Sequence, residues 1–349
     1  MNVALVHYAF RRGGGMESYL ADLVRGFRSA GDSVDVYARE VDADWARTLG
    51  ANAYQLLPLP VPRPWRNRVF ASRIARLELT RRYPLVIALA RTRGHHVAIN
   101  GGTHPGYCAA MGRPDSAQDR RETRLERAML ADARVIVAHS GTVATQIATH
   151  YPEVAGRCTV IYPPVDGSRF AVPDAERRRS ARARWGLADD ETGFVFPSMN
   201  HEIKGLAPLL EAFVALAAPK ARLLVAGRVA RGSLPPGVVS LGYVDDMPSL
   251  FAAADWTVLP SRYEAFGLVI AESLACGTPA IVARVAGAAE LMGQADGYRL
   301  DRVDAAGILE ALRAALAAPR RAPDDFVARH GLALVTHIEA LKRCAQGRP

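Results

Sequence analysis

The stretch from Pro260 to Pro279 constrains the fold more than any other, because it joins a buried strand to a helix through a short loop that contains a glycine. Residues 254–259 have the apolar run of a buried strand, and residues 268–277 have the pattern of a helix that ends at a glycine. The helix is predicted to begin near Gly267, so its first backbone N–H groups lack intrahelical partners and carry the positive end of the helix dipole. Such a helix start is suited to hold a phosphate or a diphosphate.

Two carboxylates flank this helix start. Glu264 lies in the loop before the helix, and Glu272 lies one to two turns into it. Carboxylates at these places can accept hydrogen bonds from sugar hydroxyls on either side of a bound diphosphate. For either glutamate taken alone we favour a helix cap or a solvated helix residue, and only the whole stretch favours a binding site.

The arrangement of Glu264, seven residues and then Glu272 resembles the signature of the retaining glycosyltransferases of family four, which have two Rossmann-like domains (the GT-B fold). The similarity extends over residues 241–290. In that family the first Glu contacts the transferred sugar, the loop amides hold the donor diphosphate, and the second Glu contacts the nucleotide ribose. The resemblance implies these roles for Glu264, for the loop from Phe266 to Leu268, and for Glu272.

The length and composition predict two α/β domains. A chain of 349 residues with 50% hydrophobic content can form two cores. Prolines at 163 and 164 break the alternation of strands and helices, and we place the boundary there. We expect an acceptor-side Rossmann-like domain over residues 1–164 and a nucleotide-sugar-binding one over 165–325, facing across a cleft. Residues 326–349 are expected to form a helix that returns to the first domain, as in GT-B folds.

The sequence also predicts a cytoplasmic protein without a disulfide framework. No apolar run approaches the roughly 18 residues that span a bilayer, and the apolar start has no basic leader. The four cysteines are far apart without paired spacing, which suggests neither disulfides nor a zinc site; they are Cys108, Cys158, Cys276 and Cys344. The resemblance implies a metal-independent enzyme with no cofactor besides its nucleotide-sugar substrate.

The net charge of +9 is concentrated in the first half of the chain. Through Phe170 there are 23 Arg and no Lys against 15 acidic residues, whereas the remainder has 21 basic and 20 acidic residues. This asymmetry predicts that the first half meets an anionic surface or substrate. Nucleic acid is the less favoured partner, because the arginines are not interleaved with aromatic residues in a known module.

The chain opens with a predicted strand at residues 3–8, a loop with three glycines and a helix at 19–27, the first unit of a Rossmann-like fold. The glycine spacing is not that of a dinucleotide site. By resemblance, Gly14 and Gly15 face the donor phosphates. His104 follows a predicted strand in a glycine-rich loop and is similar in placement to a family histidine that approaches the donor sugar. An Asp-x-Asp pattern begins at Asp42, but it lacks a following strand and is set aside as a metal site.

The second half supplies the expected phosphate-binding cations. Lys204 precedes a glycine at a strand-to-helix turn and resembles the family's Lys-Gly element, which contacts the donor diphosphate. The family carries an Arg five residues earlier, where this chain has Met199. Neutralisation of the phosphates is therefore expected from Lys204, the helix amides and Arg228, which follows a predicted strand. Val244 is expected to present its backbone to the nucleotide base.

A basic segment at residues 62–79 is a candidate membrane contact. Its arginines accompany Trp65, Phe70, Ile74 and Leu77, which can lie on one side of a helix. Such a helix can lie in a membrane interface, with arginines on anionic headgroups and apolar side chains in the acyl boundary. The alternative is a helix packed on its domain with solvated arginines.

Together these features favour a retaining transferase that moves a sugar from a nucleotide donor, with a UDP-sugar favoured, to an anionic cell-envelope glycolipid or polysaccharide such as lipopolysaccharide. We expect catalysis from Glu264, His104 and Lys204, and attachment to the inner face of the cell membrane is a hypothesis. A GT-B epimerase or phosphorylase is the alternative enzyme, and a noncatalytic basic module that binds membrane or nucleic acid is the alternative without catalysis. A nucleotide-dependent dehydrogenase would need the dinucleotide glycine pattern, which this chain lacks.

Overall fold

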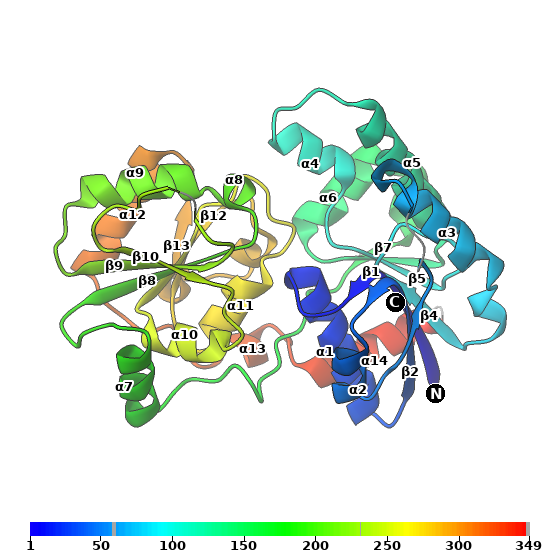
Figure 1. Cartoon of the computed structure of the whole chain (residues 1–349), viewed down its shortest axis with the longest axis horizontal. Helices are drawn as coiled ribbons and strands as arrows, with labels where there is room; N and C mark the ends of the chain where they lie inside the picture. The colour runs from blue at the N-terminus through cyan, green and yellow to red at the C-terminus, as the bar shows by residue number, and fades with distance from the viewer. Residues whose placement is uncertain (58–60, 231, 347–349) are drawn as a thin grey trace. The chain divides into compact units, whose positions relative to one another are not determined.

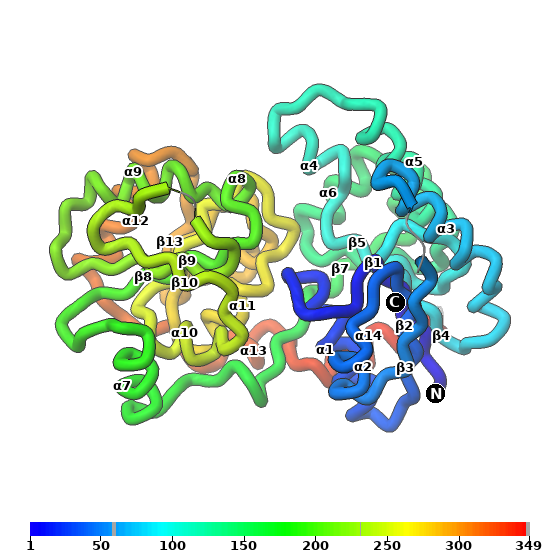
Figure 2. Tube along the Cα trace, in the orientation of Figure 1, coloured from blue at the N-terminus to red at the C-terminus, as the bar shows by residue number. Residues whose placement is uncertain are grey.

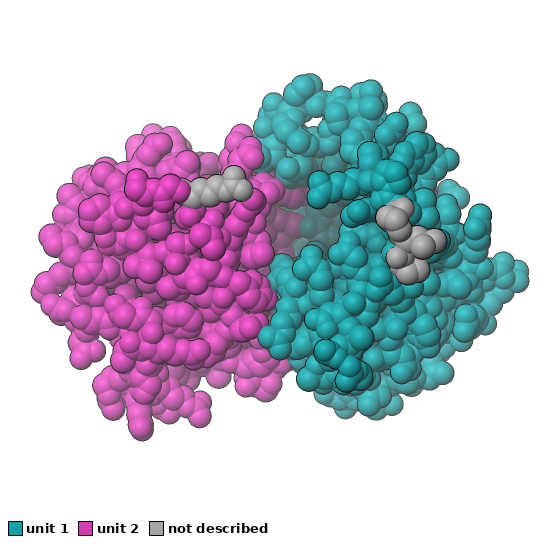
Figure 3. Space-filling view, viewed as in Figure 1, with its two compact units in different colours: residues 1–164, 332–349 teal, residues 165–331 magenta. Residues whose placement is uncertain are grey.

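The computed structural model describes residues 1–57, 61–230 and 232–346. The described chain forms two compact units, shown in separate colours in Figure 3. Unit 1 comprises Met1–Pro164 and the chain from Leu332 onward, and unit 2 comprises Val165–Gly331. Each unit contains a parallel sheet with helices packed around it (Figure 1), which is the predicted α/β class. None of the helices in these ranges is long and apolar enough to cross a bilayer.

Unit 1 has a sheet of seven strands in the order β3-β2-β1-β4-β5-β6-β7, all paired in parallel. Strands β4 and β6 are apolar and fully buried, as expected for a parallel sheet covered on both faces. The strands are β1 Asn2–Phe10, β2 Ser33–Val41, β3 Asn52–Gln55, β4 Leu85–Ala88, β5 Val97–Asn100, β6 Val135–Ala138 and β7 Cys158–Val160. The helices are α1 Gly15–Ser29, α2 Ala43–Thr48, α3 Arg66–Arg76, α4 His104–Ala110, α5 Ala117–Asp132, α6 Gly141–His150 and α14 Leu334–Ala345.

Unit 2 has a sheet of six strands in the order β10-β9-β8-β11-β12-β13, again parallel. In Figure 1, helices α9 and α12 lie on one face of this sheet and α10 and α11 on the other. The strands are β8 Thr192–Ser198, β9 Ala221–Gly227, β10 Val238–Gly242, β11 Trp256–Leu259, β12 Ala280–Ala283 and β13 Gly297–Leu300. The helices are α7 Ala175–Arg184, α8 His201–Lys204, α9 Leu206–Leu216, α10 Met247–Ala253, α11 Leu268–Ala275, α12 Ala305–Ala317 and α13 Phe326–Arg329.

The order of the strands locates the ligand-binding edge of each sheet. In unit 1 the chain builds the sheet outward from β1 to β3 and then continues on the other side from β4, so the direction reverses between β1 and β4. In unit 2 it reverses between β8 and β11. Open parallel sheets bind ligands beyond the carboxyl ends of their strands at such a reversal. The loops after β8 and β11 are therefore the place to look for a site in unit 2.

The C-terminal segment packs on α1 within unit 1, as the tube in Figure 2 shows. Gly26 of α1 allows this close approach, because a Cβ atom there would lie 2.6 Å from Cγ1 of Ile338. The buried ring of His337 hydrogen-bonds the Tyr19 hydroxyl at 2.8 Å and the Tyr162 carbonyl oxygen at 3.0 Å. We predict the returning segment from residue 326; in the structure α13 belongs to unit 2, and the chain enters unit 1 at Leu332.

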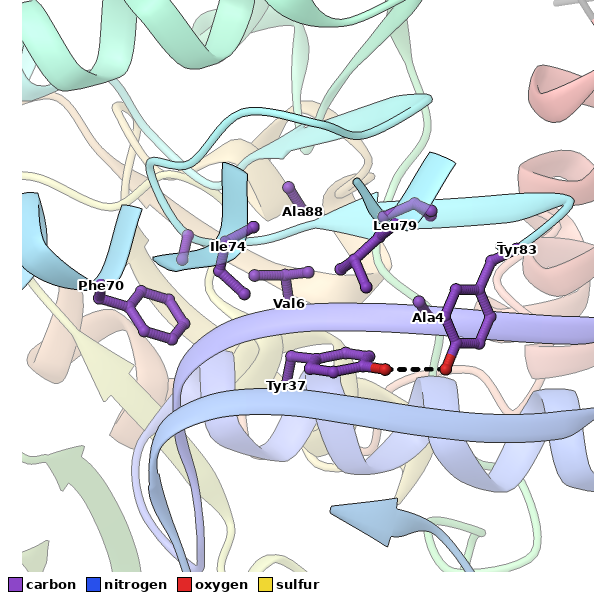
Figure 4. Close-up of a cluster of buried hydrophobic side chains, with 10 residues drawn as sticks. Ala4, Val6, Tyr37, Phe70, Ile74, Leu79, Tyr83 and Ala88 are labelled. Atoms are coloured by element: carbon purple, nitrogen blue, oxygen red, sulfur yellow. Dashed lines mark hydrogen bonds between the residues drawn. The ribbon is translucent and has the colours of Figure 1, made fainter. Parts of the chain in front are cut away.

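Helix α3 packs on the unit 1 core, which agrees with the alternative of a helix packed on its domain and not with an apolar face turned to a membrane. Phe70 is 0% and Ile74 1% exposed, and both join the buried cluster of Figure 4 with residues of β1, β2 and β4. The Tyr37 and Tyr83 hydroxyls, hydrogen-bonded at 2.8 Å, close one end of this cluster. Trp65 stays exposed. Packing against the unit 1 core removes the apolar side chains of α3 from water, so they do not need a membrane to bury them.

Candidate functional site

Two loops of unit 2 meet at the reversal between β8 and β11. Gly205 follows α8 with φ +80°, and a Cβ atom there would lie 2.3 Å from the Pro260 carbonyl oxygen. The Arg262 amide donates to the Ile203 carbonyl oxygen at 2.8 Å. These backbone contacts join the loop after β8 to the loop after β11, and only glycine fits at the point of contact.

This packing brings Lys204 and Glu264 together. The Lys204 ammonium forms an ion pair with the Glu264 carboxylate, and the two side chains are 22% and 13% exposed. Each partner therefore keeps part of its polar surface open to a ligand. The pair was not predicted from the sequence, because 60 residues separate its members.

Helix α11 begins beside this pair. Gly267 is its N-cap residue, with φ +91°. The buried Phe266 ring anchors the loop, and the Phe266 carbonyl oxygen accepts from the Ala288 amide at 2.8 Å. Leu268 and Val269 form the first turn, where backbone N–H groups have no partner within the helix. These amides can bind an anion next to Lys204.

The remaining predicted residues of unit 2 lie along the same sheet edge. Arg228 follows β9, the neighbour of β8, and its amide donates to the Ser198 carbonyl oxygen at 2.8 Å. Val244 follows β10, one strand farther out, and is 9% exposed. Glu272 lies in the second turn of α11 and is 9% exposed. We call the loops after β8, β9, β10 and β11, with the start of α11, the unit 2 edge.

Met199 lies at the end of β8 next to Arg228. A Cβ atom on Gly227, the residue before Arg228, would lie 3.3 Å from Sδ of Met199. The Met199 side chain is 49% exposed, so it packs no core that would require an apolar residue. Met199 thus lies beside the backbone that leads from β9 to Arg228.

In unit 1 the loops after β1 and β5 meet, and we call them the unit 1 edge. Gly14 is the N-cap of α1 and Gly15 its first residue. A Cβ atom on Gly101, in the loop after β5, would lie 3.0 Å from Sδ of Met16. The glycine loop at the start of α1 therefore lies against the loop that leads to His104.

His104 is the first residue of α4 and not a loop residue, which corrects the prediction. Thr103 caps the helix by accepting from the Gly106 amide at 3.1 Å, and Pro105 suits the first turn. The imidazole Nε2 lies 2.9 Å from Oδ1 of Asp119. The imidazole is thus held by a carboxylate, and 13% of the side chain remains exposed.

A buried acidic stripe on α5 supports this edge, and the sequence analysis missed it. Glu126 accepts from the His104 amide at 2.8 Å and the Tyr151 hydroxyl at 2.6 Å, and Glu122 accepts from Arg91 at 2.9 Å. Asp119, Glu122 and Glu126 are spaced on one helix face with Met129 and Leu130, all buried. This periodicity could have revealed them, but acids in such a pattern are ordinarily solvated.

Asp42 acts as the N-cap of α2. Its carboxylate accepts from the Asp44 and Trp45 amides at 3.1 and 3.0 Å. Asp44 in turn pairs with Arg47, three residues on. Both carboxylates are therefore engaged in the structure of α2.

Two family models match the chain, one in each half. Residues 13–169 match the model of Glycosyltransferase Family 4, and residues 191–318 match that of Glycosyl transferases group 1. A Burkholderia thailandensis protein named "Probable transglycosylase" is 36% identical over 313 residues, covering 88% of this chain and 84% of that protein. The D-inositol 3-phosphate glycosyltransferase of Geodermatophilus obscurus is 31% identical over 233 residues, 60% of this chain and 51% of that protein.

Solved structures confirm the predicted fold class. The structure of WaaG, a glycosyltransferase involved in lipopolysaccharide biosynthesis, has a TM-score of 0.78 at 17% identity and covers 99% of this chain and 95% of that chain. HepE of Anabaena in complex with UDP-glucose has a TM-score of 0.79 at 17% identity, over 99% of this chain and 100% of that chain. These similarities show that the chain has the GT-B fold.

Proposed function

The chain belongs to the retaining glycosyltransferases of family 4, and from this premise we propose that it moves a hexose from a nucleotide sugar, with a UDP-sugar favoured, to a cell-envelope glycolipid or polysaccharide. The observation that carries the proposal is the contact between Lys204 and Glu264 beside the first amides of α11. A cation and the N–H groups at a helix start suit a diphosphate, and a neighbouring carboxylate suits the hydroxyls of the sugar attached to it.

In the proposed complex the diphosphate lies on the amides of Phe266, Gly267 and Leu268. Lys204 has three N–H donors, so it can contact a phosphate oxygen and keep Glu264 in place. Glu264 accepts hydrogen bonds from hydroxyls of the sugar, and Glu272 accepts from the ribose. Arg228 adds charge at the phosphates, and Val244 presents its backbone to the base.

Transfer breaks the bond between the anomeric carbon and the phosphate oxygen and forms a bond from that carbon to an acceptor oxygen. Negative charge grows on the departing diphosphate, and the amides with Lys204 stabilise it in the transition state. The diphosphate takes the acceptor proton, so no side chain needs to act as the general base. Gly14, Gly15 and His104 of unit 1 are proposed to contact the donor phosphates and sugar.

The preference for uridine rests on a solved neighbour. HepE of Anabaena, which shares the fold of this chain, was solved with UDP-glucose. A starch synthase of the same fold was solved with ADP, so the fold accepts either base. The choice for this chain is therefore left to a direct comparison of donors.

The acceptor is proposed to be anionic and met at the inner face of the membrane, because positive charge is concentrated in unit 1. With the chain from Leu332 included, unit 1 has 25 basic and 15 acidic residues, against 19 and 20 in unit 2. The guanidinium groups of Arg68 and Arg121 lie over the exposed Trp65 ring, 5.6 and 5.8 Å from its centroid. This surface supports electrostatic attachment to anionic headgroups.

Calorimetric titration of the full chain with UDP-, GDP- and ADP-sugars and nicotinamide dinucleotides tests the donor. We expect UDP-sugars to bind most tightly and Lys204→Met to weaken them. Binding of nicotinamide cofactors alone would overturn the proposal. Flotation with anionic vesicles at low salt tests the surface; protein that stays at the bottom of the gradient would rule out membrane attachment.

A further inference from the structure

Two helices of unit 1 bring together three side chains that are typical metal ligands. His104 and Cys108 belong to α4, and Asp119 belongs to α5. One nitrogen, one sulfur and one carboxylate oxygen from these residues all lie within 4.8 Å of one another. The side chains are largely buried, with Cys108 3% and Asp119 7% exposed.

The local structure explains why these three atoms converge. His104 and Cys108 are four residues apart and so share one face of α4. Asp119 is held by a capping box at the start of α5, in which its Oδ2 accepts from the Ser116 amide at 3.0 Å. The cap occupies Oδ2 and leaves Oδ1 directed at His104 Nε2, 2.9 Å away.

We propose that His104, Cys108 and Asp119 bind a zinc ion. Zinc takes imidazole nitrogen, thiolate sulfur and carboxylate oxygen in tetrahedral geometry, with bonds of about 2.0–2.3 Å. Ligand atoms in such a site are roughly 3.3–3.6 Å apart. To admit the ion, the histidine and aspartate atoms need to separate by a few tenths of an ångström, and the Cys108 sulfur, which lies within 4.8 Å of them, needs to move closer.

Arg113 currently supplies the positive charge at this position. Its Nη2 lies 3.2 Å from Oδ1 of Asp119 and 4.0 Å from Sγ of Cys108. The Arg113 side chain is 48% exposed, so it can move into solvent without opening the core. A zinc ion replaces this guanidinium and keeps a fourth coordination position for a water molecule, as zinc sites with three protein ligands do.

Zinc at this site occupies the Nε2 atom of His104. Because His104 is proposed to contact the donor sugar, bound zinc withdraws it from the reaction, and this consequence rests on the proposed function. Bound zinc then inhibits transfer reversibly, because a chelator can remove the ion; we call this inhibition the brake. The zinc site itself requires only the geometry of α4 and α5.

Zinc affinity of the full chain is measured by competition with a chromophoric chelator. We expect one tight site in the wild type and a loss on the order of 100-fold in Cys108→Ser, since even indirect partners of metal ligands change affinity 10–100-fold. Cys344→Ser, a buried cysteine of α14, is the matched control and should bind like the wild type. Equal affinities in the two variants, or no tight site in the wild type, would overturn the proposal.

Arg113→Ala is expected to change the zinc affinity in the opposite direction to Cys108→Ser. Removing a competing positive charge from Asp119 should tighten zinc binding, by roughly 10-fold. A purely structural ion pair predicts no gain in affinity, so unchanged or weaker binding counts against the site. Cobalt substitution should give a thiolate charge-transfer band that disappears in Cys108→Ser and persists in Cys344→Ser.

Transfer assays with and without zinc separate this proposal from the proposed function. Inhibition that is relieved by a chelator and absent in Cys108→Ser supports the brake at this site. Inhibition that persists in Cys108→Ser places the inhibitory zinc elsewhere and overturns the brake. Full turnover of zinc-loaded protein would refute the role of His104 in transfer and leave the zinc site standing on the binding data.

Discussion

The two edges are built in different ways. The unit 2 edge depends strongly on the backbone: α11 begins at Gly267, and Gly205 meets the Pro260 carbonyl oxygen, which brings Lys204 and Glu264 together. The unit 1 edge depends more on side chains, with the His104 imidazole held by Asp119 and the His104 amide held by Glu126. A ligand common to a whole family, such as a diphosphate, suits a backbone site, because amides do not change with sequence. A variable ligand, such as an acceptor, suits side chains.

The difference extends to titratable groups. Burial lowers the pKa of five histidines of unit 1: to about 4 for His7, His95 and His337, to about 3 for His139, and also below the ordinary value for His96. Unit 2 contains two histidines, His201 and His330, and burial lowers the pKa of His330 as well. Protons therefore bear more heavily on the stability of unit 1 than on that of unit 2.

Lowering the pH should therefore destabilise unit 1 more than unit 2, and this is the largest effect that we predict. The unfolded chain binds protons on these histidines near the ordinary pKa of 6.5, but the folded unit does not until about pH 4. The stability present above pH 6.5 is thus lost as the pH falls toward 4, by about 3 kcal/mol for His337 alone. Urea unfolding with pulsed hydrogen exchange resolved by peptide measures each unit.

His337→Gln should flatten the acid dependence of unit 1, whereas His150→Gln, at the end of α6, should leave it steep. Parallel losses of stability in both units between pH 6.5 and 4.5 would contradict the comparison.

Gly205→Ala should disrupt the backbone-built edge. The new Cβ atom would lie 2.3 Å from the Pro260 carbonyl oxygen at φ +80°, so we expect a loss of about 3 kcal/mol from strain and overpacking. Displacement of Lys204 and Glu264 should lower the transfer rate on the order of 100-fold. Denaturant unfolding and steady-state kinetics measure the two effects.

The control is Gly186→Ala, where φ is +70° but no atom lies within 4 Å of the added Cβ. It should cost about 1 kcal/mol and keep full activity. Similar activity losses in both variants would show that strain, and not the Pro260 contact, determines the edge.

Glu264→Gln and Glu272→Gln should have different effects, one on turnover and the other on nucleotide affinity. We expect Glu264→Gln to lower turnover on the order of 100-fold with little change in nucleotide affinity, because its charge acts at the sugar. Glu272→Gln should weaken nucleotide affinity and spare turnover at saturation. Calorimetry with UDP and saturating kinetics test the split, and wild-type values in both variants would remove the assignment.

Arg228→Ala should have the smallest effect, a loss in donor affinity of roughly 10-fold from one phosphate contact. The same change in a Met199→Arg background should cost less, because a second cation would lie beside the phosphates. Titrations of the four proteins form a double-mutant cycle. Additive losses would show that positions 199 and 228 do not share a function.

The sequence predicted elements well where the pattern was strong and local. The strand expected at residues 3–8 is β1, and the strand and helix around Gly267 are β11 and α11. It did not predict β3, a short polar edge strand whose existence depends on pairing with β2. The sequence analysis also placed His104 in a loop, because the Thr103 cap depends on a hydrogen bond from the Gly106 amide that forms only in the folded helix.

The packing of α3 and the surroundings of Cys108 could not be predicted from the sequence for a similar reason. An amphipathic basic helix has the same sequence pattern whether its apolar side faces lipid or a core, and only the packed Phe70 and Ile74 decide between them. Paired cysteine spacing reveals a zinc site when the ligands are local. Cys108 and Asp119 lie on two helices, so no spacing rule could join them.

The sequence by itself determined the alternation of strands and helices, the helix start at Gly267 with its flanking glutamates, and the concentration of arginine in the first half, because each follows from short-range periodicity or composition. Only the tertiary structure decided that Lys204 contacts Glu264, that the α5 acids are buried, and that His104, Cys108 and Asp119 converge. Such contacts depend on where the sheet brings the ends of distant segments, and pairwise distance is not encoded in any local pattern.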